Sequence, residues 1–85
     1  MISLYTKENC PKCEHLKGVL DELGVDYEIC PTEESKNFDK VWNLGINTLP
    51  VLIRRYKNFD NIHVLHKGFT KKNVKKFIDD TEGND

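Results

Sequence analysis

The sequence has no long hydrophobic run, few cysteines and no excess of charge of either sign. No apolar stretch approaches the roughly 20 residues of a membrane-spanning helix, and Lys7, Glu8 and Asn9 interrupt the one near the N-terminus, which argues against a signal peptide. The 13 Lys and Arg residues nearly balance the 14 Asp and Glu residues, so nothing draws the chain generally to nucleic acid. We therefore expect a cytoplasmic protein that binds neither nucleic acid nor membrane.

The 3 cysteines are too few and too unevenly spaced for the disulfide framework of a secreted mini-protein. Cys10 and Cys13 form a close pair, which leaves Cys30 without an evident partner. We expect Cys30 to be a small buried or rim residue, because a free cysteine behaves as a hydrophobe. The chain of 85 residues is expected to form one domain over 1–85, since a second core would need about another 50 residues.

Hydrophobic periodicity predicts the element order β-α-β-α-β-β-α. The first strand, helix and strand form a unit that requires parallel strands and a right-handed crossover, and residues 57–61 carry turn chemistry between two later strands. The tail, residues 81–85, is expected to fray. Strands are predicted at residues 2–5, 26–30, 51–56 and 62–66, and helices at about 11–23, around 38–44, and from about residue 71 onward.

The predicted helices carry local signals for their ends and their buried faces. For the second helix, either Thr32 or Ser35 is a candidate cap, and Phe38 and Trp42 are expected in the core because they share helical spacing with Val41. For the third helix, Thr70 is the expected N-cap, and Phe69 with Val74 would form a hydrophobic staple. Exposed lysines of this helix are read as a solvated face: Lys71, Lys72, Lys75 and Lys76.

The segment Cys10-Pro11-Lys12-Cys13 lies where the first strand gives way to the first helix. A helix that begins at Pro11 aims unpaired backbone N–H groups and the positive end of its dipole at the Cys10 sulfur, which favours the thiolate. Lys7 and Lys12 would add positive charge nearby. We therefore expect Cys10 to be a nucleophile with a pKa below the ordinary value of about 8.5.

A CxxC pair beside a βαβ pattern is typical of thioredoxin-like redox domains, and the chain resembles the glutaredoxin family from residue 1 to about 80. The matching pieces are Tyr5-Thr6-Lys7, the CxxC segment, Thr48-Leu49-Pro50 and Gly68. The resemblance implies an α/β, thioredoxin-like fold of the glutaredoxin type, with a four-stranded mixed sheet flanked by three helices. It also leads us to expect a monomer.

The resemblance further implies a dithiol thiol–disulfide oxidoreductase. Cys10 would attack a substrate disulfide and Cys13 would resolve the mixed disulfide, with no tightly bound cofactor and with glutathione as co-substrate. Pro50 would be a cis-proline, and Leu49 would offer its backbone to the substrate. The substrate-binding residues implied are Lys7, Pro11, Lys12, Thr48, Leu49, Pro50, Gly68, Phe69 and Thr70.

The reductant stays open at the level of sequence. Glutathione-using members commonly have Tyr between the cysteines and Gly-Gly before the last helix, whereas this chain has Lys12 and Gly68-Phe69, and the bulk of Phe69 could close the groove. Gly68-Phe69 also resembles the glutaredoxin-like hydrogen donors of ribonucleotide reductase, which thioredoxin reductase reduces. Either reading implies cytosolic disulfide proteins, such as ribonucleotide reductase, as targets.

The cysteine pair is also compatible with two other kinds of site. A zinc site would need two further ligands from Cys30 and the histidines His15, His63 and His66, and no second CxxC or finger-spaced His pair is present, so no metal site is expected. A thioredoxin-like binding or metal-carrying module with incidental cysteines also stays open. The substitution Cys10→Ser separates it from an enzyme, because only the enzyme would lose its activity.

Overall fold

The computed structural model describes residues 2–55 and 62–82, which form the seven elements in the predicted order. Four strands and three helices alternate along the chain as β-α-β-α-β-β-α. Their bounds are β1 Ile2–Thr6, α1 Pro11–Glu22, β2 Tyr27–Pro31, α2 Ser35–Asn43, β3 Val51–Arg55, β4 Ile62–Leu65 and α3 Lys71–Glu82.

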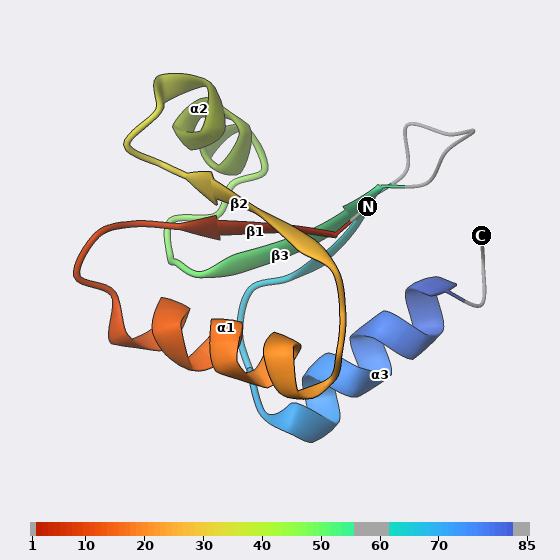
Figure 1. Ribbon diagram of the computed structural model, residues 1–85. Helices are drawn as coiled ribbons and strands as arrows, with labels where there is room; N and C mark the ends of the chain where they lie inside the picture. Colours follow the sequence, from red (N-terminus) through yellow and green to blue (C-terminus); the bar gives the residue numbers. More distant parts are fainter. Residues whose placement is uncertain (1, 56–61, 83–85) are drawn as a thin grey trace.

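The strands form one mixed sheet in the order β2-β1-β3-β4. β1 is parallel to β2, in a register that pairs Leu4 with Ile29, and antiparallel to β3, in a register that pairs Tyr5 with Val51. β3 and β4 are antiparallel. Figure 1 shows α1 and α3 on one face of the sheet and α2 alone on the other. The predicted α/β, thioredoxin-like arrangement is confirmed.

The two faces of the sheet carry unequal cores. The larger cluster lies between the sheet and the helices α1 and α3; its buried members are Ile2, Leu4, Leu16, Val19, Leu20, Leu52, Val74 and Ile78. The smaller cluster lies on the α2 side and consists of Tyr5, Val41, Val51 and Ile53. Alternation along β1 explains the division, because neighbouring residues of a strand point to opposite faces.

Helix α2 departs from the prediction in two respects. Its N-cap is Glu34, without a side-chain cap bond, because the hydroxyl of Thr32 instead donates to the carbonyl of Thr6 at 2.9 Å. Its aromatic residues are not in the core: Phe38 is 50% exposed and Trp42 63% exposed, while Val41 is buried. The physical reason is that α2 covers its face of the sheet alone, so only one line of its side chains meets the strands.

Helix α3 agrees with the prediction at its start and differs at its end. Thr70 is the N-cap, since its hydroxyl accepts a bond from the Asn73 N–H at 3.2 Å, and Phe69 packs against the larger cluster. The backbone is still helical at residues 81–82. The prediction that the frayed tail begins at residue 81 is therefore wrong. Residues 83–85 lie outside the described part.

The remaining differences are at the ends of elements. α1 ends at Glu22 rather than Leu23, β2 excludes Asp26, and β4 ends before His66. The predicted turn at residues 57–61 and the end of the third strand at Tyr56 lie outside the described residues. Within residues 2–55 and 62–82, no helix is long and apolar enough to cross a membrane.

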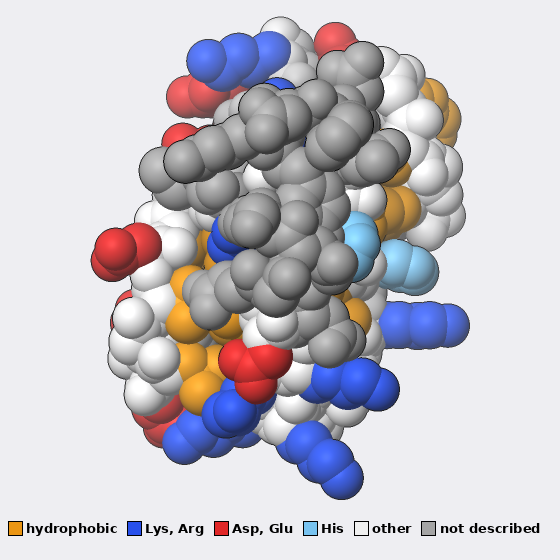
Figure 2. Space-filling model, turned by 90° about the vertical axis from the view of Figure 1, so that its right-hand side faces the viewer, with side chains coloured by type: hydrophobic (Ala, Val, Ile, Leu, Met, Phe, Trp, Pro, Cys, Tyr) orange, Lys and Arg blue, Asp and Glu red, His pale blue; other side chains and the backbone are white. Residues whose placement is uncertain are grey.

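The lysines of α3 are exposed and some of them are paired. Lys71 contacts Glu22 at 3.3 Å and Lys75 contacts Asp79 at 2.9 Å. Figure 2 shows basic side chains gathered along the lower edge of this face, at the height at which Figure 1 places α3, with an acidic side chain among them. Such pairing is typical of a solvated helix face.

Candidate active site

A tight turn after β1 places Cys10 at the start of α1. Asn9 adopts the left-handed conformation (φ 54°), which asparagine tolerates better than most residues. Cys10 is then the N-cap of α1 and Pro11 occupies the first turn, where its missing N–H costs nothing. The backbone N–H of Cys13 donates to the Cys10 Sγ at 3.1 Å. The sulfur therefore takes the place of a capping oxygen.

Cys10 and Cys13 are joined by a disulfide, with their Cα atoms 5.2 Å apart. Cys13 is 1% exposed and lies against the core, whereas Cys10 is 7% exposed and is the outer sulfur. In the reduced chain the Cys13 N–H and the positive end of the α1 dipole would stabilise negative charge on Cys10. The geometry therefore suits an outer nucleophile and an inner second thiol.

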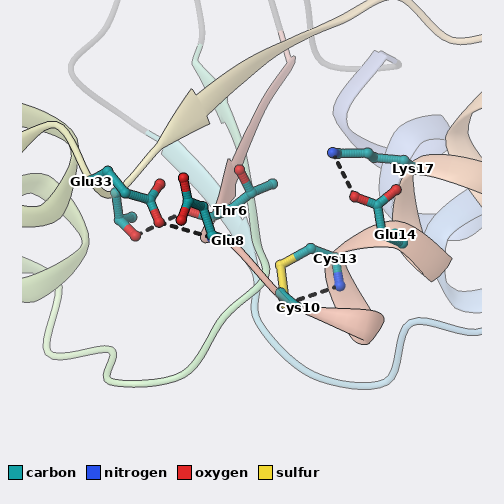
Figure 3. The surroundings of a disulfide bond; sticks show 8 residues. Thr6, Glu8, Cys10, Cys13, Glu14, Lys17 and Glu33 are labelled. Carbon is teal, nitrogen blue, oxygen red and sulfur yellow. Dashed lines mark hydrogen bonds and ion pairs between the residues drawn. A yellow bond between two sulfur atoms is a disulfide. The ribbon is translucent and has the colours of Figure 1, made fainter.

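Contacts with the segment after β2 hold the turn that carries Cys10. The Glu33 carboxylate accepts a bond from the Glu8 N–H at 2.8 Å, and the carbonyl of Thr6 accepts bonds from the Thr32 backbone and hydroxyl. Figure 3 shows these contacts beside the disulfide. Because they join residues 25 and 26 positions apart, no local sequence signal reveals them.

Basic side chains flank Cys10 in the sequence. Lys7 and Lys12 are both exposed, and neither makes a hydrogen bond or ion pair with the part of the chain that the structure describes. They are thus available to an anionic ligand. Pro11 is also exposed, at the first position of the helix.

The segment before β3 reaches the same end of the sheet. The pairing of Tyr5 with Val51 places Pro50 next to the end of β1, from which the chain turns to Cys10. The Leu49–Pro50 peptide bond is cis, Pro50 is fully buried and Thr48 is exposed. The Leu49 backbone makes no hydrogen bond to the described residues, so a bound extended peptide could pair with it.

The loop before α3 is tied to α1 by a histidine of α1. His15 Nε2 lies 3.2 Å from the carbonyl of Phe69, a bond that the Nε2–H tautomer donates. Asn73 Nδ2 donates to the carbonyl of Gly68 at 3.0 Å, and Gly68 has φ 73°, which favours glycine. These bonds fix the residues 68–70, and a contact across 54 positions has no local signal.

Phe69 is half-buried, and its ring packs against the larger core cluster. It also lines an open hollow between α1 and α3 together with His15, Gly18 and Val19. Part of the Phe69 side chain is therefore buried against the protein's own core.

Cys30 lies apart from the disulfide, on the edge strand β2. Its Sγ donates to a Glu28 carboxylate oxygen at 3.7 Å. Burial, followed by the negative charge of Glu28, raises the pKa of the Cys30 thiol. Among residues 2–55 and 62–82, no three His, Cys, Asp or Glu side chains come together as a metal site would require.

Comparison with protein families gives a match over most of the chain. The family model described as Glutaredoxin matches residues 2–56, which include the CxxC pair and the segment Thr48-Leu49-Pro50. A search of curated proteins finds no match.

Comparison with solved structures finds similar folds at low sequence identity. NrdH-redoxin from Escherichia coli superimposes with a TM-score of 0.68 at 22% identity, over 88% of this chain and 91% of that one. Thioredoxin 1 from Thermosipho africanus gives 0.65 at 17% identity, over 96% and 93%. A thioredoxin-like protein from Clostridium perfringens gives 0.65 at 21% identity, over 93% and 68%. The shared feature is the thioredoxin-like fold.

Proposed function

The chain belongs to the glutaredoxin family, and from this premise we propose that it is a dithiol thiol–disulfide oxidoreductase with Cys10 as nucleophile and Cys13 as resolving thiol. One observation carries the assignment: the outer sulfur, Cys10 Sγ, caps α1 and accepts the Cys13 N–H at 3.1 Å. A thiolate at that position is stabilised by a fixed donor and by the helix dipole.

The reaction transfers two electrons from the dithiol to the substrate. The Cys10 thiolate attacks one sulfur of a substrate disulfide; a Cys10–substrate bond forms, the substrate bond breaks, and the leaving sulfur takes a proton from water. Cys13 then loses its proton and attacks the Cys10 sulfur, which releases the second substrate thiol. The product is the Cys10–Cys13 disulfide present in the structure.

Glutathione is the reductant that we propose for this disulfide. Two glutathione molecules would restore the dithiol and leave as glutathione disulfide. Lys7 is available to one glutathione carboxylate, and the N-terminus of α3 at Thr70 offers backbone donors to another. The packing of Phe69 against the core supports an open groove.

A second candidate is reduction by thioredoxin reductase, in a donor that serves ribonucleotide reductase. Two observations favour it: Gly68-Phe69 stands where glutathione-using members commonly have Gly-Gly, and the structural neighbour NrdH-redoxin is described as a glutaredoxin-like protein with a thioredoxin-like activity profile.

The two candidates are separated by supplying the oxidised protein with either complete reducing system. One contains glutathione, its reductase and NADPH, and the other contains thioredoxin reductase and NADPH; NADPH loss is followed with a small disulfide as substrate. Turnover with glutathione alone supports the first proposal, and turnover with thioredoxin reductase alone supports the second. The Cys10→Ser variant should be inactive and Cys30→Ser active. Silence of the wild type in both systems contradicts the enzyme proposal and favours a binding module.

A further inference from the structure

Helix α2 presents an exposed aromatic pair. The rings of Phe38 and Trp42 stack with centroids 6.0 Å apart and an interplanar angle of 15°. They follow the helical i, i+4 spacing on either side of Val41, which alone of the three is buried. Large exposed apolar side chains held together on one surface commonly mark a binding site.

The aromatic pair forms one wall of a small hollow. The hollow has a volume of about 110 Å³, and its lining contains no charged side chain, although 32% of the residues in the chain are charged. An apolar cavity of about 150 Å³ admits benzene, so this hollow fits a branched aliphatic side chain. Its lining residues are Thr32, Phe38, Val41, Trp42, Ile46, Asn47, Thr48 and Leu49.

Two further lining residues belong to the proposed active site. Thr48 and Leu49 line the hollow and lead directly into Pro50, which lies beside the end of β1 near the turn to Cys10. The Leu49 backbone is the edge at which an extended substrate would pair. Side chains of an extended peptide alternate with a period of two, so a residue close to the reacting cysteine would be directed at the hollow.

The chemistry of the lining distinguishes protein substrates from glutathione. Glutathione consists of γ-glutamate, cysteine and glycine, and it has no apolar side chain to fill an uncharged hollow. Glu33 holds the turn that carries Glu8 beside the active site, and the negative charges of these two side chains would repel a substrate carboxylate placed next to them. An apolar side chain of a peptide can fill the uncharged hollow and is not repelled by these carboxylates.

We propose that this hollow is a subsite for an apolar side chain flanking the reactive cysteine of a protein disulfide substrate. The inference rests on the proposed function and adds a substrate preference to it. Trp42 and Phe38 are specificity residues that bind the flanking side chain and leave the sulfur chemistry to Cys10 and Cys13.

The test uses single-cysteine peptides in which the cysteine is held as a mixed disulfide with 2-mercaptoethanol. Members of the series differ only by leucine or serine at one of the two positions on either side of the cysteine. Each reacts with an excess of pre-reduced protein in a rapid-quench experiment, so no reductase is needed. At one of these four flanking positions, the peptide with leucine should react about tenfold faster than the peptide with serine, as expected for burial of an aliphatic side chain.

Substitutions in α2 test whether the aromatic pair causes the preference for leucine. Trp42→Ala and Phe38→Ala should each lower the leucine-to-serine ratio, and the double variant should bring it close to one. Ile29→Ala is the matched control: Ile29 is also a large exposed hydrophobe, at 48%, but its register with Leu4 places it on the other face of the sheet. The control should keep the wild-type ratio.

The outcomes separate this inference from the proposed function. If pre-reduced protein fails to reduce hydroxyethyl disulfide in a Cys10-dependent reaction, both fail. If that reaction proceeds but the wild type shows no leucine preference at any position, only the subsite is overturned. A wild-type dimer in sedimentation that Trp42→Ala converts to monomer would also overturn it, because the aromatic pair would then bind a second copy.

Discussion

Cys10 and Cys30 show how surroundings decide what a thiol can do. Cys10 accepts a fixed N–H at the positive end of a helix, whereas burial and the Glu28 carboxylate raise the pKa of Cys30. Because the thiolate is the reacting species, these environments push the two reactivities apart.

We predict that iodoacetamide at pH 7 alkylates Cys10 of the reduced protein at least about tenfold faster than Cys30. Peptide mass spectrometry over time measures both rates, and thiolate absorbance of Cys13→Ser measures the Cys10 pKa directly. Cys30 labelled first, or a Cys10 pKa at or above that of an ordinary thiol, would contradict the assignment of the nucleophile.

Tyr5 gives a prediction about pH and stability. Burial chiefly, and then the nearby Cys30, raises the pKa of Tyr5 from 10.0. The folded chain thus retains a proton that the unfolded chain loses, so this contribution to stability is complete below pH 10 and is lost as pH rises through the folded-state pKa. Urea unfolding of Cys30→Ser, with and without Tyr5→Phe, should show a smaller loss between pH 8 and pH 11 when Tyr5 is replaced. An equal loss of stability with and without Tyr5→Phe would contradict a raised pKa of Tyr5 in the folded chain.

At the scale of elements, the start of α3 depends on a single side-chain bond. The Thr70 hydroxyl accepts the Asn73 N–H at 3.2 Å, and removal of such a cap typically costs about 1 kcal/mol. We predict that Thr70→Ala lowers the free energy of unfolding by about this amount and that Thr70→Ser largely preserves it. Urea unfolding measures both, and equal stability of the two variants would show that the cap contributes nothing.

The helices show which predictions a sequence supports. Thr70 was predicted correctly because its partner is three residues away in the chain, and local chemistry decides the cap. Thr32 failed as a cap because its hydroxyl is bonded to Thr6 of another strand. The spacing of Phe38, Val41 and Trp42 predicts a shared apolar side of α2, but it cannot show how much of that side the sheet reaches.

At the scale of the molecule, the fold followed from patterns and the site followed only in part. Alternating strands and helical stripes were sufficient for the element order, and the resemblance to the glutaredoxin family supplied the four-stranded mixed sheet. Cys10, Cys13 and the cis Leu49–Pro50 bond belong to short motifs, so they could be named in advance. The contacts His15–Phe69 and Glu8–Glu33 join distant segments, and they depend on a register that no motif specifies.

The two layers of the core should contribute unequally to stability, since the cluster under α1 and α3 is larger than the one under α2. Leu20 is fully buried between α1 and the sheet, so Leu20→Ala should cost about 2–5 kcal/mol, a large share of the roughly 5–15 kcal/mol that stabilises a typical domain. Trp42 is 63% exposed, so Trp42→Ala should change the free energy of unfolding by only about 0.5 kcal/mol. Urea unfolding compares the two variants. A cost for Trp42→Ala that approaches that of Leu20→Ala would mean that the ring holds the fold together, and its exposure would no longer point to a substrate. A small loss of stability for Trp42→Ala would agree with a role of the exposed Trp42 ring in binding substrate at the hollow.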